Sequence, residues 1–408
     1  MHIESRRKLS FFSILLTYFV DNLGWSIVFP IFAPLFLNPD NSLFIKEISF
    51  STRTTFLGLF LAVFPLAQFF GAPIMGEMAD RSGRKNALVL SIILTLMGYL
   101  VTAFSIQNNS LLWMFFGRFI SGVFSGNVSI CLAVVSDLSP TEKIKVKNFG
   151  LLSILTGFSF MLGTYIGGKF SDQNILSFFN PAFPLWIASF LSVINFVFIY
   201  FGFKETYEIH KRVKYSFTEG FNNIYQALKT KNIKTIYVIY FLFIFGWTIL
   251  FQFSPVLVIN KFGFTSSQIG DVAAFMGICW AIGAGPINKL LSKSFSANKI
   301  LSVALVVFAV LCSLVGFPNK IAYVISILGF CILIGGLGWP LCNAIISNKA
   351  TQNIQGKIMG MSQSMQSLAM VVSSIVGGFA DHISVYFPFL IAGFATFMAA
   401  LMYFKVKF

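Results

Sequence analysis

The sequence has little charge. Only 11% of its 408 residues are Asp, Glu, Lys or Arg, whereas soluble domains carry about 25%. Hydrophobic residues make up 56% and the mean hydropathy is +0.81. Apolar runs recur that are long enough to cross a bilayer, which takes about 20 residues. Short segments of alternating polarity, typical of a membrane barrel, are not visible. The composition therefore predicts an integral membrane protein made of helices.

Other shortages exclude further classes of protein. The three histidines, His2, His210 and His382, are far apart, so no metal site is indicated. The five cysteines all fall in apolar segments, and their odd number argues against a disulfide framework. No Gly-x-x-x-x-Gly-Lys-Ser/Thr loop occurs, so no nucleotide motor is encoded. We expect a protein that is not an enzyme, that needs no cofactor and that works as a monomer.

Twelve candidate spans follow from the apolar runs. They lie at about residues 10–36, 54–76, 86–106, 110–136, 148–169, 183–203, 234–259, 268–290, 300–317, 321–347, 358–380 and 385–404. With the N-terminus inside, the outer connections hold only Lys46, Arg53, Lys169, Lys261 and Lys320, and most other Lys and Arg residues lie in inner ones. This bias predicts that both termini face the cytoplasm. The net charge of +15 would then face anionic membrane lipid rather than nucleic acid.

The chain divides into two halves of six spans each. A charged, amphipathic stretch at 204–233 separates 1–203 from 234–408 and is predicted to be a cytoplasmic linker, part of it a short helix on the membrane surface. "GLLSILTGFSFMLGTYIGGKFSD" from Gly150 is similar to "GMSQSMQSLAMVVSSIVGGFADH" from Gly360, and "LGWSIVFPIFAP" is similar to "FGWTILFQFSP". Two parallel six-span repeats are a transporter plan with the solute site near the midplane. Chance similarity between apolar helices is the alternative.

The connection "GEMADRSGRK" resembles the signature loop of the major facilitator superfamily. The matching positions are Gly76, Asp80, Arg81, Gly83, Arg84 and Lys85. Gly76 would let two helices approach closely, Gly83 suits a tight turn, and the mixed charges could form a network at an inner gate. An ordinary basic inner loop is the alternative.

The resemblance extends along the chain. "GRFISGVFSG" is similar to the family's second motif, with Arg118 as its basic residue, and Asp137 resembles the acid that pairs with the loop arginine. The resemblance implies an all-α membrane fold of two six-helix bundles. It also implies that Asp80, Arg84 and Asp137 form a latch at the cytoplasmic side, with Asp80 near the start of the span at Gly360, where a helix dipole favours an acid.

Within the superfamily the sequence is similar to the tetracycline and multidrug proton-antiporter branch. It departs from that branch in the fifth span, where Thr164 replaces an expected proline and Ser159 a glycine. It also lacks the acids of tetracycline exporters in the third and ninth spans. We therefore expect a proton-coupled transporter of a small organic solute in a bacterial inner membrane, with export preferred. Uptake of a metabolite, nucleoside or siderophore is the alternative, and a non-transporting receptor is a more distant one.

Polar and aromatic residues inside the spans are candidates for the solute path, because polar groups are costly in a membrane. Interhelical hydrogen bonding is the alternative for the amides, and plain packing for the tryptophans. The candidates are Asn22, Trp25, Gln68, Asn127, Trp247, Gln252, Trp280, Trp339, Asn343, Gln363 and Gln366.

Asp21, in "DNLGW", is the acid that lies well inside a span. An aspartate at the centre of a span costs about 2.5–3.5 kcal/mol on insertion scales. Three explanations compete: permanent pairing with Arg118, capping of a break near Gly24, or proton exchange during transport. The residue aligned with Asp21 in the second half is Phe243, so symmetric packing does not require an acid. Proton coupling through Asp21 and Arg118 is the preferred interpretation.

Overall fold

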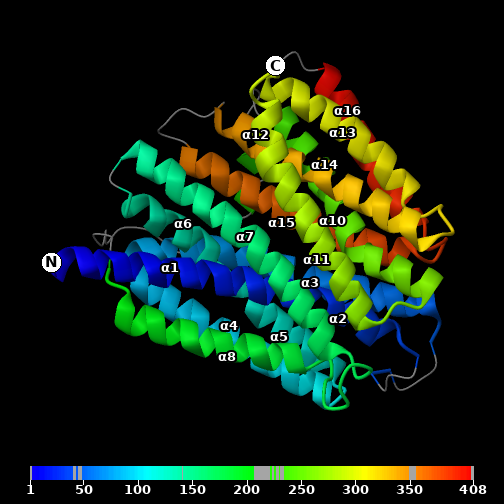
Figure 1. Cartoon of the computed structure of the whole chain (residues 1–408), viewed down its shortest axis with the longest axis horizontal. Helices are drawn as coiled ribbons and strands as arrows, with labels where there is room; N and C mark the ends of the chain where they lie inside the picture. The colour runs from blue at the N-terminus through cyan, green and yellow to red at the C-terminus, as the bar shows by residue number, and fades with distance from the viewer. Residues whose placement is uncertain are drawn as a thin grey trace. The chain divides into compact units, whose positions relative to one another are not determined.

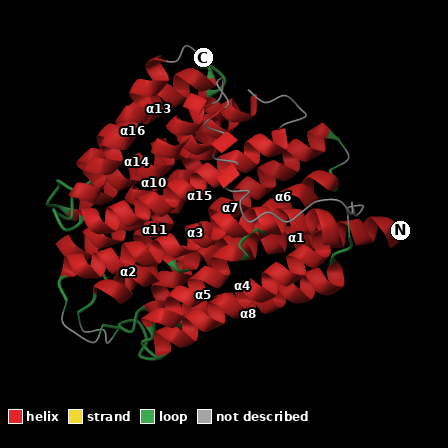
Figure 2. Cartoon of the chain, turned by 180° about the vertical axis from the view of Figure 1, so that it is seen from behind, coloured by secondary structure: helices red, strands yellow, loops and turns green. Residues whose placement is uncertain are grey.

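The computed structural model describes residues 2–39, 43–44, 48–139, 141–205, 221–222, 225–226, 229, 234–348 and 355–405. Within those ranges every regular element is a helix (Figures 1 and 2). The predicted membrane-surface helix falls mostly in the linker, outside the described residues.

The helices follow the predicted spans along the whole chain. In the first half they are α1 (His2–Ile27) with α2 (Phe29–Leu37), α3 (Phe50–Ser82), α4 (Arg84–Gln107), α5 (Leu111–Val123) with α6 (Asn127–Asp137), α7 (Glu142–Ser171), and α8 (Phe183–Val197) with η1 (Phe198–Gly202). In the second half they are α10 (Lys234–Phe262), α11 (Ser266–Ile282) with η2 (Gly283–Ile287) and α12 (Asn288–Leu291), α13 (Ala297–Leu314), α14 (Ile321–Asn348), α15 (Gln355–Ala380) and α16 (Phe387–Lys405).

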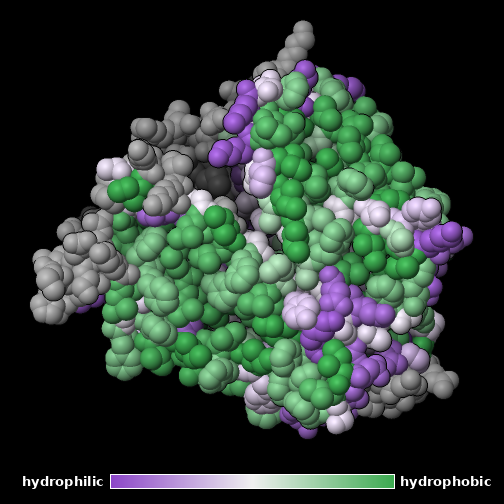
Figure 3. Space-filling view, in the orientation of Figure 1, coloured by the Kyte–Doolittle hydropathy of each residue, from purple (hydrophilic) through white to green (hydrophobic). Residues whose placement is uncertain are grey.

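The predicted membrane fold is confirmed. Among the described residues, 11 helical segments are long and apolar enough to cross a membrane. The remaining predicted span, 358–380, is the 26-residue helix α15. Figure 3 shows that apolar side chains cover most of the visible surface. Leu112 and Phe201 are each 78% exposed, as expected for side chains that face lipid.

Two of the predicted spans are broken. The first span is interrupted at Val28, where α1 ends and α2 begins. Pro30 explains the break, because it cannot donate a hydrogen bond to the carbonyl of Ser26 one turn earlier. The fourth span is interrupted at 124–126, between α5 and α6. A methyl group on Gly71 of α3 would overlap the Val123 carbonyl, so α3 passes very close to this second break.

The chain separates into two compact units. One consists of Met1–Ile31 and Leu66–Thr218, and the other of Phe32–Pro65 and Glu219–Phe408. Residues 32–65 therefore group with the second half of the chain in this conformation. One close contact within this unit joins Gly58 of α3 to Gly378 of α15, where a Cβ on Gly58 would lie only 2.8 Å from the Gly378 Cα. The domain boundaries predicted from the sequence stay a prediction.

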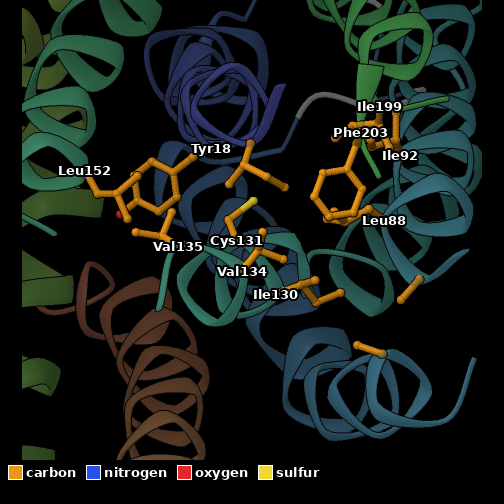
Figure 4. Close-up of a cluster of buried hydrophobic side chains, with 13 residues drawn as sticks. Tyr18, Leu88, Ile92, Ile130, Cys131, Val134, Val135, Leu152, Ile199 and Phe203 are labelled. Atoms are coloured by element: carbon orange, nitrogen blue, oxygen red, sulfur yellow. The ribbon is translucent and has the colours of Figure 1, made fainter. Parts of the chain in front are cut away.

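The first unit has a buried apolar core around α1, α4, α6 and α7. Tyr18, Cys131, Val134 and Leu152 belong to this cluster (Figure 4). The α4 and α5 helices approach closely at Gly98 and Gly117, where a Cβ on either glycine would lie 2.9 Å from the carbonyl oxygen of the other. Small residues at such crossings let the backbones of membrane helices pack tightly.

The second unit is built on α10, which packs against α15 and α16, while α13 packs against α14 and α16. Its core contains large, fully buried aromatic side chains, namely Tyr237, Tyr240, Phe243, Phe253 and Phe308. Aromatic side chains bury large areas and fix the spacing of the helices.

Candidate functional site

Asp21 lies in the first unit within a network of polar side chains. Its Oδ1 accepts a hydrogen bond of 3.1 Å from the Asn127 amide of α6. The Asn127 side-chain oxygen in turn accepts a hydrogen bond from the Ser91 hydroxyl of α4. Asn127 is 1% exposed and Ser91 is fully buried. The break before α6 places Asn127 at the first position of that helix, so its amide reaches α1.

In this conformation the structure argues against two of the three explanations for Asp21. Gly24 lies inside α1, and the break is one turn later, at Val28, so Asp21 does not cap a break near Gly24. The carboxylate accepts from Asn127, and no ion pair joins it to Arg118 in the described part of the chain. Its Oδ2 is buried and has no hydrogen-bond partner among those residues. Proton exchange stays a prediction.

Arg118 is nevertheless part of the same neighbourhood, and Tyr99 connects the two. Arg118 is 5% exposed and Tyr99 is 6% exposed. Each follows a glycine of the α4–α5 crossing, Tyr99 after Gly98 and Arg118 after Gly117. The Tyr99 side chain interacts electrostatically with both Asp21 and Arg118. Neither Tyr99 nor Ser91 was among the residues predicted from the sequence. The Gly98–Tyr99 pair inside an apolar span was the available signal.

A second polar cluster lies in the other unit, on α10, α14 and α15. The Gln366 side-chain oxygen accepts hydrogen bonds from the Tyr240 hydroxyl (2.9 Å) and from the Trp339 indole (3.2 Å). The Tyr240 hydroxyl also interacts with the Asn343 side chain. Trp339 is 41% exposed, so its ring presents an open aromatic surface beside the amides. The structure thus brings together three predicted residues, and adds Tyr240, which was not predicted from the sequence.

Other predicted path residues have local explanations. Gln252 accepts a 2.6 Å hydrogen bond from the Ser374 hydroxyl. Trp247 packs among the rings of Phe243, Phe251 and Phe308, as the packing alternative has it. The Asn22 amide donates to the Tyr18 carbonyl within α1. The remaining candidates belong to neither cluster: Trp25, which packs near Phe160, the half-buried Gln68 and Trp280, and the exposed Gln363.

The signature loop is described only in part. Arg84 Nε lies 3.9 Å from Asp137 Oδ2, so one arm of the expected latch is present as an ion pair. The side chains of Asp80 and Arg81 lie outside the described residues, as do those at the start of α15. The expectation for Gly76 was wrong among the described atoms, because a Cβ there would meet nothing within 4 Å.

A residue from the start of the linker holds the end of this loop. Gly83 has a φ of 91°, which a residue with a side chain rarely adopts. It precedes α4 without supplying a side-chain cap. Instead the Lys85 backbone N–H donates a 3.0 Å hydrogen bond to the Glu205 carboxylate. An acid at a helix N-terminus is stabilised by the unpaired N–H groups there. Glu205 was not predicted, because the helix it caps is remote in sequence.

Arg84→Ala is expected to lower transport several-fold while the protein still inserts and folds. The substitution leaves Asp137 without the arginine that pairs with it, and a transporter needs two conformations of similar energy. Transport rates in membrane vesicles and labelling of an inner-face cysteine check this.

Lys405→Ala is the control, because Lys405 is an exposed basic residue at the end of α16, outside the signature loop. Equal rates and equal labelling in wild type and Arg84→Ala would rule out a gating role.

The family follows from the sequence match. The family model of the Major Facilitator Superfamily matches the chain twice, over residues 14–285 and 236–407. The chain belongs to the major facilitator superfamily. Two overlapping matches accord with the similar motifs in the two halves. Members of this family move solutes and are not enzymes, so the chain is a multi-pass membrane transporter.

Individual relatives are similar at low identity. The class H tetracycline resistance protein of Pasteurella multocida is 24% identical over 400 residues, with 96% of this chain and 92% of the relative covered. Multidrug resistance protein 2 of Bacillus subtilis (strain 168) is 26% identical over 399 residues, with 96% and 93% covered. Among solved structures, a D-xylose–proton symporter has a TM-score of 0.74 at 16% identity, with 99% and 98% covered. That likeness shows the fold alone.

Proposed function

We propose that this chain is a proton-coupled exporter of a small organic solute in a bacterial inner membrane, with both termini in the cytoplasm. The observation that carries the proposal is the half-buried Asp21, whose Oδ1 accepts from Asn127 and whose buried Oδ2 has no hydrogen-bond partner among the described residues. The unpartnered Oδ2 is an oxygen that can take up a proton. Few other groups inside the described spans can do this.

The Tyr240, Trp339, Asn343 and Gln366 cluster is proposed as the part of the solute site contributed by the second unit. Its donors and acceptors are neutral amides, a hydroxyl and an indole. Because Tyr240 and Trp339 both donate to the Gln366 oxygen, the Gln366 NH₂ group is turned the other way. A flat solute with a carbonyl could stack on the Trp339 ring and accept from that NH₂ group.

Export is preferred over uptake because relatives named for tetracycline and multidrug resistance are similar over nearly the whole chain. Uptake is kept as a second candidate because of the fifth span. There Thr164 is fully buried and donates back to the Phe160 carbonyl (3.0 Å) within the α7 helix. A proline at this position would remove a backbone hydrogen bond and bend the helix. Because Thr164 stands in place of that proline, the sequence does not predict such a bend in α7.

Proton movement in membrane vesicles of both orientations tests the proposal. In everted vesicles with an acidic lumen, adding tetracycline, ethidium or another exported solute is expected to dissipate the pH gradient. Antiport would move the solute into the lumen and protons out of it. In right-side-out vesicles, adding a sugar or nucleoside would raise the external pH if the chain takes up its solute with protons. Vesicles without the protein are the control. No solute-dependent proton movement in either orientation would contradict both candidates.

A further inference from the structure

The Tyr99 side chain in the first unit occupies space that is open because residue 24 is a glycine. A methyl group on Gly24 would overlap the Tyr99 hydroxyl, so the absence of a side chain at Gly24 lets the phenol reach the α1 helix. Residues three apart are neighbours on one side of a helix. Gly24 therefore places the hydroxyl one turn from Asp21 on α1.

The α4–α5 crossing determines where Tyr99 begins, because Tyr99 follows a glycine of that crossing. Gly98 and Gly117 bring the two backbones together, and the residues that follow them are Tyr99 and Arg118. Tyr99 interacts electrostatically with Arg118 and with Asp21.

The Asp21 carboxylate has a place for one further donor. Asn127 donates to Oδ1, while Oδ2 is buried and has no hydrogen-bond partner among the described residues. A buried carboxylate is stabilised in its ionised form by each donor that it accepts from. A phenol supplies one donor without adding a charge.

We propose that Tyr99 is a positioning residue for proton exchange: its hydroxyl donates to Asp21 Oδ2 when the carboxyl is ionised and leaves that oxygen when it takes up a proton. The inference rests on the proposed function, since it concerns how Asp21 exchanges protons. Arg118 interacts electrostatically with the same phenol.

The groups around Asp21 on the packed helices are few. From α6, Cys131 interacts electrostatically with Asp21 and Tyr18. From α7, the Thr156 hydroxyl pairs with the Tyr18 hydroxyl at 2.8 Å. From α8, Asn195 accepts a hydrogen bond from Thr17. Tyr99 and Arg118 come from α4 and α5. Tyr18 therefore offers a matched control, a buried tyrosine on the same helix as Asp21 whose hydroxyl is engaged elsewhere.

An infrared titration of purified protein in liposomes tests the proposal without a solute. The carbonyl stretch of a protonated carboxyl appears as the pH falls, and Asp21→Asn identifies the part that belongs to Asp21. Tyr99→Phe is expected to move the midpoint of that part upward by about one to two pH units, the equivalent of one hydrogen bond to a charged group. The midpoint rises because loss of the donor weakens the ionised form. Tyr18→Phe is expected to leave it unchanged.

Gly24→Ala is a second variant, which keeps the Tyr99 hydroxyl but places a methyl group in the space that the hydroxyl occupies. It is expected to raise the midpoint as well, and combining it with Tyr99→Phe should add nothing further. An unshifted midpoint in both single variants, or an equal shift in Tyr18→Phe, overturns the role of Tyr99 and leaves proton coupling at Asp21 standing. If Asp21→Asn removes no titrating band, then proton exchange at Asp21 fails and the role of Tyr99 fails with it.

Discussion

Asp21→Asn is expected to abolish solute accumulation driven by a proton gradient while preserving insertion, folding and downhill exchange of solute. Asparagine has nearly the same shape as aspartate, and its side-chain oxygen can still accept the hydrogen bond from Asn127. The variant therefore keeps the local contacts and loses only the ability to bind and release a proton. Coupling should disappear, because a transporter without its proton carrier can equilibrate a solute but cannot concentrate it.

Accumulation and exchange are measured side by side in energised and de-energised vesicles, over a range of pH. The rate of exchange in Asp21→Asn is expected to be nearly independent of pH. Asp271→Asn is the control, since Asp271 is an exposed acid on α11. If Asp21→Asn still concentrates solute with a normal dependence on pH, another group carries the proton.

The helices were predictable because apolar length decides them. Every predicted span is a helix, and the break at Val28 lies two residues before a proline that the sequence displays. What pattern reading misses is the partner of each polar side chain. Asn127 and Asp21 were both candidates, but their hydrogen bond depends on the break before α6. Glu205 and Lys85 are 120 residues apart, and only the folded chain brings that pair together.

The glycines also show that the sequence does not reveal which helices pack against each other. The sequence suggested close helix approach at Gly76, where the described atoms leave open space, but suggested no close approach at Gly24 or Gly58. A glycine in a membrane helix permits a close approach but does not say which helix approaches. Only the tertiary structure shows which helix lies against each glycine. It also shows which polar groups Tyr99 and Tyr240 contact.

The contact between α3 and α15 in the second unit leads to the other large expected effect. Gly58 and Gly378 touch backbone to backbone, and a Cβ on Gly378 would lie 3.0 Å from the Gly58 Cα. The Thr55 hydroxyl donates to the Gly378 carbonyl at 3.1 Å and lies 2.9 Å from the His382 ring. Asp381, just beyond α15, is 5% exposed. Burial raises the pKa of Asp381, while a hydrogen bond with Thr54 and the charge of His382 act to lower it.

Gly378→Val is expected to prevent this packing and to reduce transport by a factor between about five and about one hundred. The overlap would be with backbone atoms, which cannot rotate away, and overpacking of this kind costs about 1–3 kcal/mol. Every 1.4 kcal/mol changes a population about tenfold, so a transporter that alternates between states of similar energy would spend little time with these helices joined. A cysteine at Thr55 should then react faster with a membrane-impermeant maleimide. Gly150→Ala is the control, because a Cβ at Gly150 meets nothing within 4 Å. Unchanged transport and labelling in Gly378→Val would mean that the α3–α15 contact is not needed in the cycle.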